Sequence, residues 1–172
     1  SGLTIGGVSA SNYALIQPTT TADITGKTLT VSGITAASKP YDGTTTATLN
    51  TAGAVLIGVA GGDTVTLNTA SAAGAFATAT VGTGKTVTVS GLTVGGASAG
   101  NYSLVQPTTT ADITGRTLTV SGITAANKVY DGTTTATLNT AGATLVGVLS
   151  GDTVTLNTAS AAGAFATAAV GT

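Results

Sequence analysis

The chain has no Cys, Met, Trp, His or Glu, and its only charged side chains are five Lys or Arg and six Asp among 172 residues. Without thiols, imidazoles or glutamates it offers no thiolate nucleophile, no histidine base and none of the usual zinc-ligand patterns. Five basic residues spread along the chain make no electrostatic footprint for nucleic acid. No apolar run approaches the roughly 18 residues that a membrane span needs. These absences argue against an enzyme, a nucleic-acid-binding protein and membrane insertion.

Threonine and glycine dominate what is present, with 40 and 25 residues respectively. The chain is also rich in Val, Leu, Ile and Ala, which separates it from disordered sequences. Apolar residues alternate with Thr or Ser in short runs bounded by Gly- and Asp-containing turns, which is the pattern of strands with one buried face. Residues 69–75 are short and contain Gly, and we assign them to a loop. The predicted strands are 28–32, 46–49, 54–59, 64–67, 75–81, 86–89, 102–106 and 110–113.

The sequence repeats itself after 89 residues without a gap. Residues 1–83 align with 90–172 and differ from them at 13 positions. A period of 89 is too long for a solenoid coil and suits an independent β-sandwich domain. We therefore predict an all-β fold of tandem antiparallel β-sandwich repeats, immunoglobulin-like in architecture. The side chains predicted to point inward are Leu29, Val31, Leu49, Leu67, Phe76, Val87, Val89 and Tyr102.

The phase of the repeat divides the chain into three parts. Residues 1–26 are predicted to be the C-terminal strands of a preceding repeat, 27–115 a complete repeat domain, and 116–172 the N-terminal part of the next. About three residues link successive domains, too few for a flexible tether. With no starting Met and no signal sequence, we expect the chain to be an internal piece of a longer protein.

This phase leaves an incomplete sandwich at each end, with unpaired strand edges that seek a partner strand. We expect residues 1–26 of one molecule to complete residues 116–172 of another, head to tail, by strand addition. The alternative is that a longer chain completes both ends itself. If Tyr13, Leu15 and Ile24 packed only inside a closed domain of their own chain, the complementation hypothesis and the assigned phase would both be wrong.

The string Lys39-Pro-Tyr-Asp-Gly-Thr-Thr-Thr-Ala-Thr48 returns with one change as Lys128-Val-Tyr-Asp-Gly-Thr-Thr-Thr-Ala-Thr137. Together with the closing segment Asn101-Tyr-Ser-Leu-Val-Gln-Pro-Thr-Thr-Thr-Ala-Asp-Ile-Thr114, it resembles the signature of YDG-type repeat domains, which are similar to the MBG-type repeats of large bacterial surface proteins. The resemblance covers essentially the whole chain. It implies tandem all-β domains of secreted adhesins or filamentous-haemagglutinin-like exoproteins of Gram-negative bacteria, and hence an extracellular or cell-surface location. It carries no catalytic residue onto this sequence.

The most conspicuous candidate residues form the Tyr-Asp-Gly string and its copy. We favour a structural turn, in which Asp accepts local backbone hydrogen bonds, Gly supplies a positive φ and Tyr packs its ring. The alternative is a ligand or calcium contact through the carboxylate. A calcium site wants several clustered oxygens, and the Asp residues at 23, 42 and 63 form no DxDxD string, so no cofactor is expected, with calcium left open. The motif residues are Tyr41, Asp42, Gly43, Tyr130, Asp131 and Gly132.

Three functions remain to be weighed. The first is a structural stalk or filament segment, whose partners are adjacent repeats or other copies of the chain. The second is an adhesive module that binds host or environmental glycans or a protein, although sugar-binding surfaces favour aromatic side chains and this chain has no Trp and only four Tyr. The third is a Thr-rich ice-binding surface, but the Thr-x-Thr pairs lose their spacing of 18 after Thr64. A Lys–Asn isopeptide bond would need a buried acid beside the pair. We favour the stalk.

Overall fold

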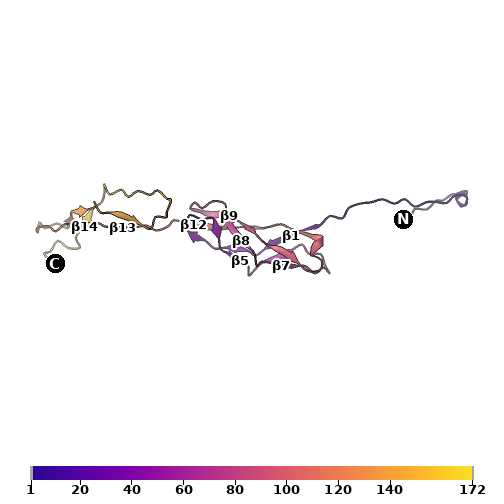
Figure 1. Ribbon diagram of the computed structural model, residues 1–172, viewed down its shortest axis with the longest axis horizontal. Helices are drawn as coiled ribbons and strands as arrows, with labels where there is room; N and C mark the ends of the chain where they lie inside the picture. Colours follow the sequence, from indigo (N-terminus) through magenta and orange to yellow (C-terminus); the bar gives the residue numbers. More distant parts are fainter. Residues whose placement is uncertain (1, 172) are drawn as a thin grey trace.

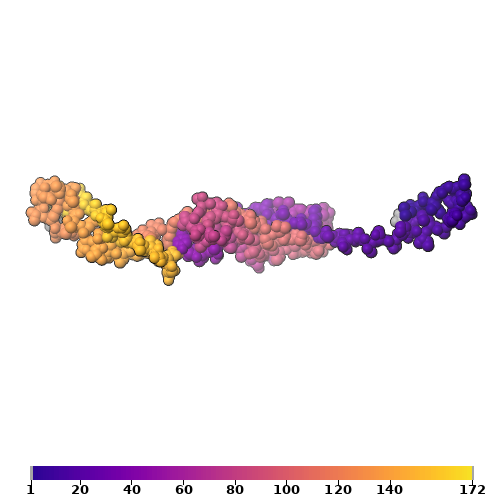
Figure 2. All heavy atoms as spheres, turned by 90° about the horizontal axis from the view of Figure 1, so that it is seen from above, coloured from indigo at the N-terminus to yellow at the C-terminus, as the bar shows by residue number. Residues whose placement is uncertain are grey.

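The structure is a computed structural model that describes residues 2–171 (Figure 1). Over that range it contains 18 strands, two short 3-10 helices and no α-helix, so the predicted all-β fold is confirmed. The molecule is elongated, with a central body of strands between an extended N-terminal segment and a smaller C-terminal part (Figures 1 and 2). Neither helix described in residues 2–171 has the length and apolar character to cross a membrane.

The central body spans residues 27–114, and the C-terminal part spans 116–171. The 3-10 helices are η1 (Ala10–Asn12) and η2 (Ala99–Asn101). The central strands are β1 (Lys27–Ser32), β2 (Thr35–Ala36), β3 (Lys39–Pro40), β4 (Thr46–Ala47), β5 (Leu49–Asn50), β6 (Val55–Ile57), β7 (Thr66–Asn68), β8 (Ala73–Phe76), β9 (Gly82–Ser90), β10 (Thr93–Gly95), β11 (Tyr102–Leu104) and β12 (Thr108–Thr114). The C-terminal strands are β13 (Thr119–Ser121), β14 (Thr124–Ala125), β15 (Thr135–Ala136), β16 (Leu138–Asn139), β17 (Thr144–Val146) and β18 (Gly163–Ala164).

The central body is built on a five-stranded sheet of order β3-β12-β9-β8-β4 and a three-stranded sheet of order β11-β1-β6, with the pairs β2-β5 and β7-β10 beside them. The prediction of purely antiparallel sheets is wrong at two places. β1 runs parallel to β11, with Lys27 opposite Tyr102, and β3 runs parallel to β12, with Lys39 opposite Ile113. Both parallel pairs join an early strand to a closing strand, because the chain enters the body at one end and leaves it at the other. The immunoglobulin-like arrangement stays a prediction.

The core of the body lies on the inner face of the five-stranded sheet. Phe76, Val87 and Ile113 form one buried cluster there, and Val31 and Val89 belong to a second. Half-buried Leu49 packs against both clusters and so joins them. Of the eight residues predicted inward, Leu29, Val31, Phe76, Val87 and Val89 are buried, while Leu49, Leu67 and Tyr102 are half-buried. The buried residues that the alternation did not single out are Ile34, Ala47, Leu92, Ala111 and Ile113.

Strand β8 begins and ends earlier than predicted. It starts at Ala73, inside the segment assigned to a loop, and stops at Phe76 rather than continuing to residue 81. The reason is local hydrogen bonding that the alternation does not register. The Lys85 ammonium donates to the Thr78 hydroxyl at 2.8 Å, and Thr78 and Thr80 bond to each other, which holds these threonines in a connection before β9.

The N-terminal segment, residues 2–26, contains η1 and no strand. Tyr13 is 73% exposed, Leu15 is exposed and Ile24 is fully exposed, so these side chains do not pack inside a closed domain of their own chain. The result that would have overturned the assigned phase is therefore not found. In the C-terminal part, β13 starts three repeat positions later than β1 does in the central body. The first three residues of β1 are the ones that pair with β11. The division at residues 26 and 115 remains a prediction.

Candidate functional site

The Tyr-Asp-Gly string lies in the loop between β3 and β4, where Asp42 organises a tight turn. Its Oδ1 accepts hydrogen bonds from the Thr44 backbone N–H and from the Thr44 hydroxyl, each at 2.9 Å. Gly43 has a φ of 77°, in the left-handed region that favours glycine. The copy makes the same turn, with Asp131 bonded to Thr133 in both ways and Gly132 at a φ of 75°.

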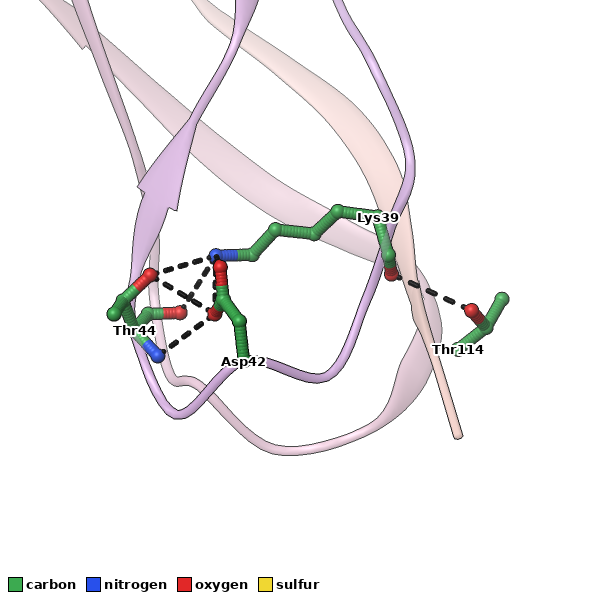
Figure 3. Close-up of polar contacts among 4 residues, drawn as sticks. All are labelled: Lys39, Asp42, Thr44 and Thr114. Carbon is green, nitrogen blue, oxygen red and sulfur yellow. Dashed lines mark hydrogen bonds and ion pairs between the residues drawn. The ribbon is translucent and has the colours of Figure 1, made fainter. Parts of the chain in front are cut away.

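Lys39 closes this turn from the preceding strand (Figure 3). Its Nζ donates to both carboxylate oxygens of Asp42 at 2.8 and 3.0 Å, and to the carbonyl and hydroxyl oxygens of Thr44 at 2.9 Å each. The same ammonium lies 5.7 Å from the centroid of the Phe76 ring, within cation–π range. Hydrogen bonds from Lys39 and Thr44 lower the pKa of the Asp42 carboxyl from 3.8 to about 2. The two oxygens on Asp42 are therefore occupied by a lysine cap.

The turn signal at residues 41–44 includes Thr44, but sequence reasoning did not assign Lys39 to this turn. The signal was present, because both copies read Lys-x-Tyr-Asp-Gly-Thr. In the copy, the Lys128 ammonium bonds to Asp131 at 2.7 Å and to Thr133, and it lies 5.7 Å from the Phe165 ring centroid. The lysine, the turn and the phenylalanine thus form one module that occurs twice, with its phenylalanine buried in the central body and exposed in the copy, where Phe165 is 37% exposed.

Tyr41 faces the following part of the chain. Its backbone N–H donates to the carbonyl of Thr114, the last residue of β12, at 2.8 Å. Its hydroxyl donates to Oδ1 of Asp152, 111 residues along the sequence, at 3.1 Å. This hydrogen bond to a carboxylate raises the pKa of Tyr41 above its ordinary value of 10.0. The Tyr-Asp-Gly tyrosine therefore connects the central body to the C-terminal part.

Two further contacts surround this hydrogen bond. The Arg116 Nε donates to the Gly147 carbonyl at 2.7 Å, within the C-terminal part. A Cβ on Gly43 would lie 3.6 Å from Leu149 Cδ1, so the turn backbone sits against that leucine. A cavity of about 150 Å³ lies between the two parts, lined by Tyr41, Val81, Arg116, Leu118, Leu149 and Asp152.

Tyr102, which we call the closing tyrosine because it lies in the closing segment of the repeat, holds a loop inside the central body. Its hydroxyl donates to Asp63 Oδ2 at 2.5 Å and accepts from the Ala60 backbone N–H at 2.9 Å. The hydrogen bond to Asp63 raises the pKa of Tyr102 above 10.0. Asp63 and Asp42 thus engage different partners, and across residues 2–171 no three acidic, His or Cys side chains gather as a metal site would require.

Comparison with protein families identifies the repeat. The YDG domain model matches residues 25–111 and again residues 114–172. A search of curated proteins and a search of solved structures gave no significant match. The two matched ranges cover most of the 172 residues, and each contains one copy of the lysine-capped Tyr-Asp-Gly turn. The chain therefore belongs to the YDG domain family.

Proposed function

We propose that the chain is a stalk or filament segment of an extracellular bacterial adhesin, in which repeats of 89 residues are joined rigidly end to end. The observation that carries this proposal is the direct contact between the two parts, in which Tyr41 of one bonds to Asp152 of the next. The central body would be one complete repeat, residues 27–115, and the C-terminal part would begin the next.

The connection between the parts supports a fixed angle. Strand β12 ends at Thr114, and Arg116 already bonds to Gly147 inside the C-terminal part. Only Gly115 lies between these two anchored residues, which is far too short for a flexible tether. The elongated outline of the molecule also supports two parts that are held in line (Figure 2).

The use of Tyr41 and Tyr102, the two tyrosines of the central body, favours a stalk over a glycan-binding module. Tyr41 and Tyr102 both direct their hydroxyls to aspartate carboxylates near the ends of the central body. An aromatic platform for a sugar ring would instead need an open ring face. The threonines of the strands face outward as uncharged, stiff, β-favouring side chains, which suits a solvated surface that stays the same along an array.

Small-angle scattering on chains of two and three complete repeats tests the stalk. We expect the maximum dimension to grow by an equal step with each repeat, because the short connections keep successive repeats in line. Raising the salt concentration should leave the dimension unchanged, since the central body and the C-terminal part meet through few charges. A three-repeat chain as compact as a globular protein of its mass would contradict the proposal.

A further inference from the structure

Asp63 and Asp152 are the same position in successive repeats, 89 residues apart. Yet the structure shows them with different tyrosines. Asp63 accepts from Tyr102 of its own repeat, and Asp152 accepts from Tyr41 of the preceding one. Each bond uses one of the two chemically equivalent oxygens of its carboxylate. An ionised carboxylate has acceptor sites for both at once.

We propose that this aspartate is shared at each junction by two tyrosines, one from its own repeat and one from the repeat before it. The proposal rests on the end-to-end arrangement of the proposed function and names the group that fixes it. The inner tyrosine is the closing tyrosine, which bonds to the carboxylate of its own repeat. The outer tyrosine is the one in the Tyr-Asp-Gly string, which bonds to the carboxylate of the following repeat.

The strand register brings Tyr41, the outer of the two tyrosines, to the junction. Strand β3 lies parallel to the end of β12, with Pro40 opposite Thr114. Tyr41 follows Pro40 and bonds to Thr114, so it sits where the chain leaves the repeat. The tyrosine of the Tyr-Asp-Gly string is therefore placed at the exit of each repeat by pairing within the sheet.

The register also brings the aspartate loop to the entry of the next repeat. Strand β17 pairs antiparallel with β13, with Val146 opposite Thr119, so the residues after Val146 return toward Arg116. In the central body the equivalent pair is Ile57 with Thr30 on β1. Tyr102 lies opposite Lys27 at that same entry. Tyr41 of one repeat, the aspartate loop of the next repeat and the Tyr102 position of that next repeat are thus brought to one junction.

The loop that carries the aspartate has the same shape in both repeats. The Asp63 N–H donates to the Ala60 carbonyl and the Asp152 N–H to the Leu149 carbonyl, each at 3.1 Å. The glycine before each aspartate has a positive φ, 91° at Gly62 and 97° at Gly151. The carboxylate is consequently presented alike in both. The exchange of alanine for Leu149 adds an apolar contact against Gly43, so repeats can vary the fit without changing the shared group.

The first test follows the tyrosine rings by NMR in the 172-residue chain, labelled at the carbon that bears the hydroxyl. We expect Asp152→Asn to move the Tyr41 signal and to bring its titration midpoint down toward 10.0. The matched control, Asp63→Asn, should move Tyr102 and leave Tyr41 in place. A Tyr41 signal that Asp152→Asn does not move overturns the proposal, whatever happens at Tyr102.

The second test asks whether two tyrosines share one carboxylate. Residues 84–115 are appended after residue 172, which completes the second repeat and supplies it with its own copy of Tyr102. Hydrogen exchange is then measured at the amides of residues 149–152. We expect Tyr41→Phe, and the same change in the appended tyrosine, each to speed exchange about fivefold, the effect of one lost hydrogen bond.

If Tyr41→Phe has no effect once the appended tyrosine is present, the inner tyrosine excludes the outer one and the sharing proposal fails. Scattering from the same extended chain reports on the stalk separately. A rod in which Tyr41→Phe changes nothing overturns only the shared aspartate. A compact particle overturns the stalk itself.

Discussion

At the scale of single residues, Lys39 is the side chain that determines how many hydrogen-bond acceptors the Tyr-Asp-Gly turn leaves free. Its ammonium neutralises Asp42, bonds to Thr44 and caps the Phe76 ring, so the turn presents few free acceptors. A sequence predicts the Asp and Gly roles because both are local. It does not predict the contact of the Lys39 ammonium with the Phe76 ring, because Phe76 reaches this loop only through the pairing of β8 with β4.

The ion pair at Asp42 predicts a defined acid response. The pKa of this carboxyl is lowered from 3.8 to about 2 in the folded chain. A depressed folded pKa means that the carboxylate stabilises the fold above about pH 3.8 and that this contribution is lost as the pH falls through about 2. Urea unfolding followed by circular dichroism should show this loss. In Asp42→Asn the stability should be lower at pH 7 and its slope between those values smaller, with the contribution of Asp131, whose pKa is also lowered to about 2, remaining. An unchanged pH slope in the variant would show that Asp42 is not the titrating group.

At the scale of elements, alternation located most strands of the central body but not the short strands β2, β3 and β10, and it did not identify which strands pair. Runs of alternating Thr and aliphatic residues gave β1 and β9 because burial of one face fixes a period of two. The parallel pairing of β1 with β11 is invisible to such a pattern, since it depends on where the chain returns after about 70 residues. Side chains that replace backbone partners are equally hidden. Gln106, for example, bonds to both the N–H and the carbonyl of Leu92.

The turn after β1 gives a prediction on element packing. Gly33 has a φ of 78°, and a Cβ there would lie 1.9 Å from the Gly53 carbonyl oxygen. We expect Gly33→Ala to cost well over 1 kcal/mol of unfolding free energy, because the backbone must move and the left-handed conformation is itself unfavourable for alanine. Urea unfolding measures the loss. Gly100→Ala is the control, because nothing lies within 4 Å of its Cβ position and the aligned residue is Ser11. Equal stability of the two variants would contradict the close approach.

At the scale of the whole molecule, the two ends of the 172-residue chain carry complementary features. Ile113 is 1% exposed and lies opposite Lys39, whereas its copy Ile24 is fully exposed. In the C-terminal part, Lys128 and Phe165 line an open cavity of about 420 Å³, where the equivalent position in the central body is covered. If residues 1–26 of a second molecule paired with the C-terminal part as β12 pairs with β3, Ile24 would lie opposite Lys128.

We therefore predict that the 172-residue chain, produced on its own, associates head to tail. Sedimentation equilibrium should show a mass that rises with concentration through multiples of 16.2 kDa, because such a contact is heterologous and does not close. Deleting residues 1–26 should abolish association. Appending residues 84–115 after residue 172 should abolish it too, by completing the second repeat within one chain. A monomer at all concentrations would contradict this prediction and would favour the alternative, in which a longer chain completes both terminal repeats itself.

The repeat of 89 residues predicts a tandem array, but the copies form the same strands only where their pairing partners are present: residues 2–26 contain no strand, whereas their copy forms β10, β11 and β12. The contact between the copies could not be predicted. Tyr41 and Asp152 are 111 residues apart and meet only because two separate registers, β3 with β12 and β13 with β17, bring their loops to the same place. Sequence patterns specify which face of a strand is buried, but not which loops adjoin.

The parallel pairing of β1 with β11 and of β3 with β12 determines how a repeat would respond to being pulled by its ends. Tension would draw β1 backward from Lys27 while it drew the closing strands forward through Thr114. Each parallel pair would then slide along its own length, and its hydrogen bonds would have to break together rather than one after another. The two parallel pairs therefore give the central body two shear-loaded contacts between strands, a geometry that suits the proposed stalk.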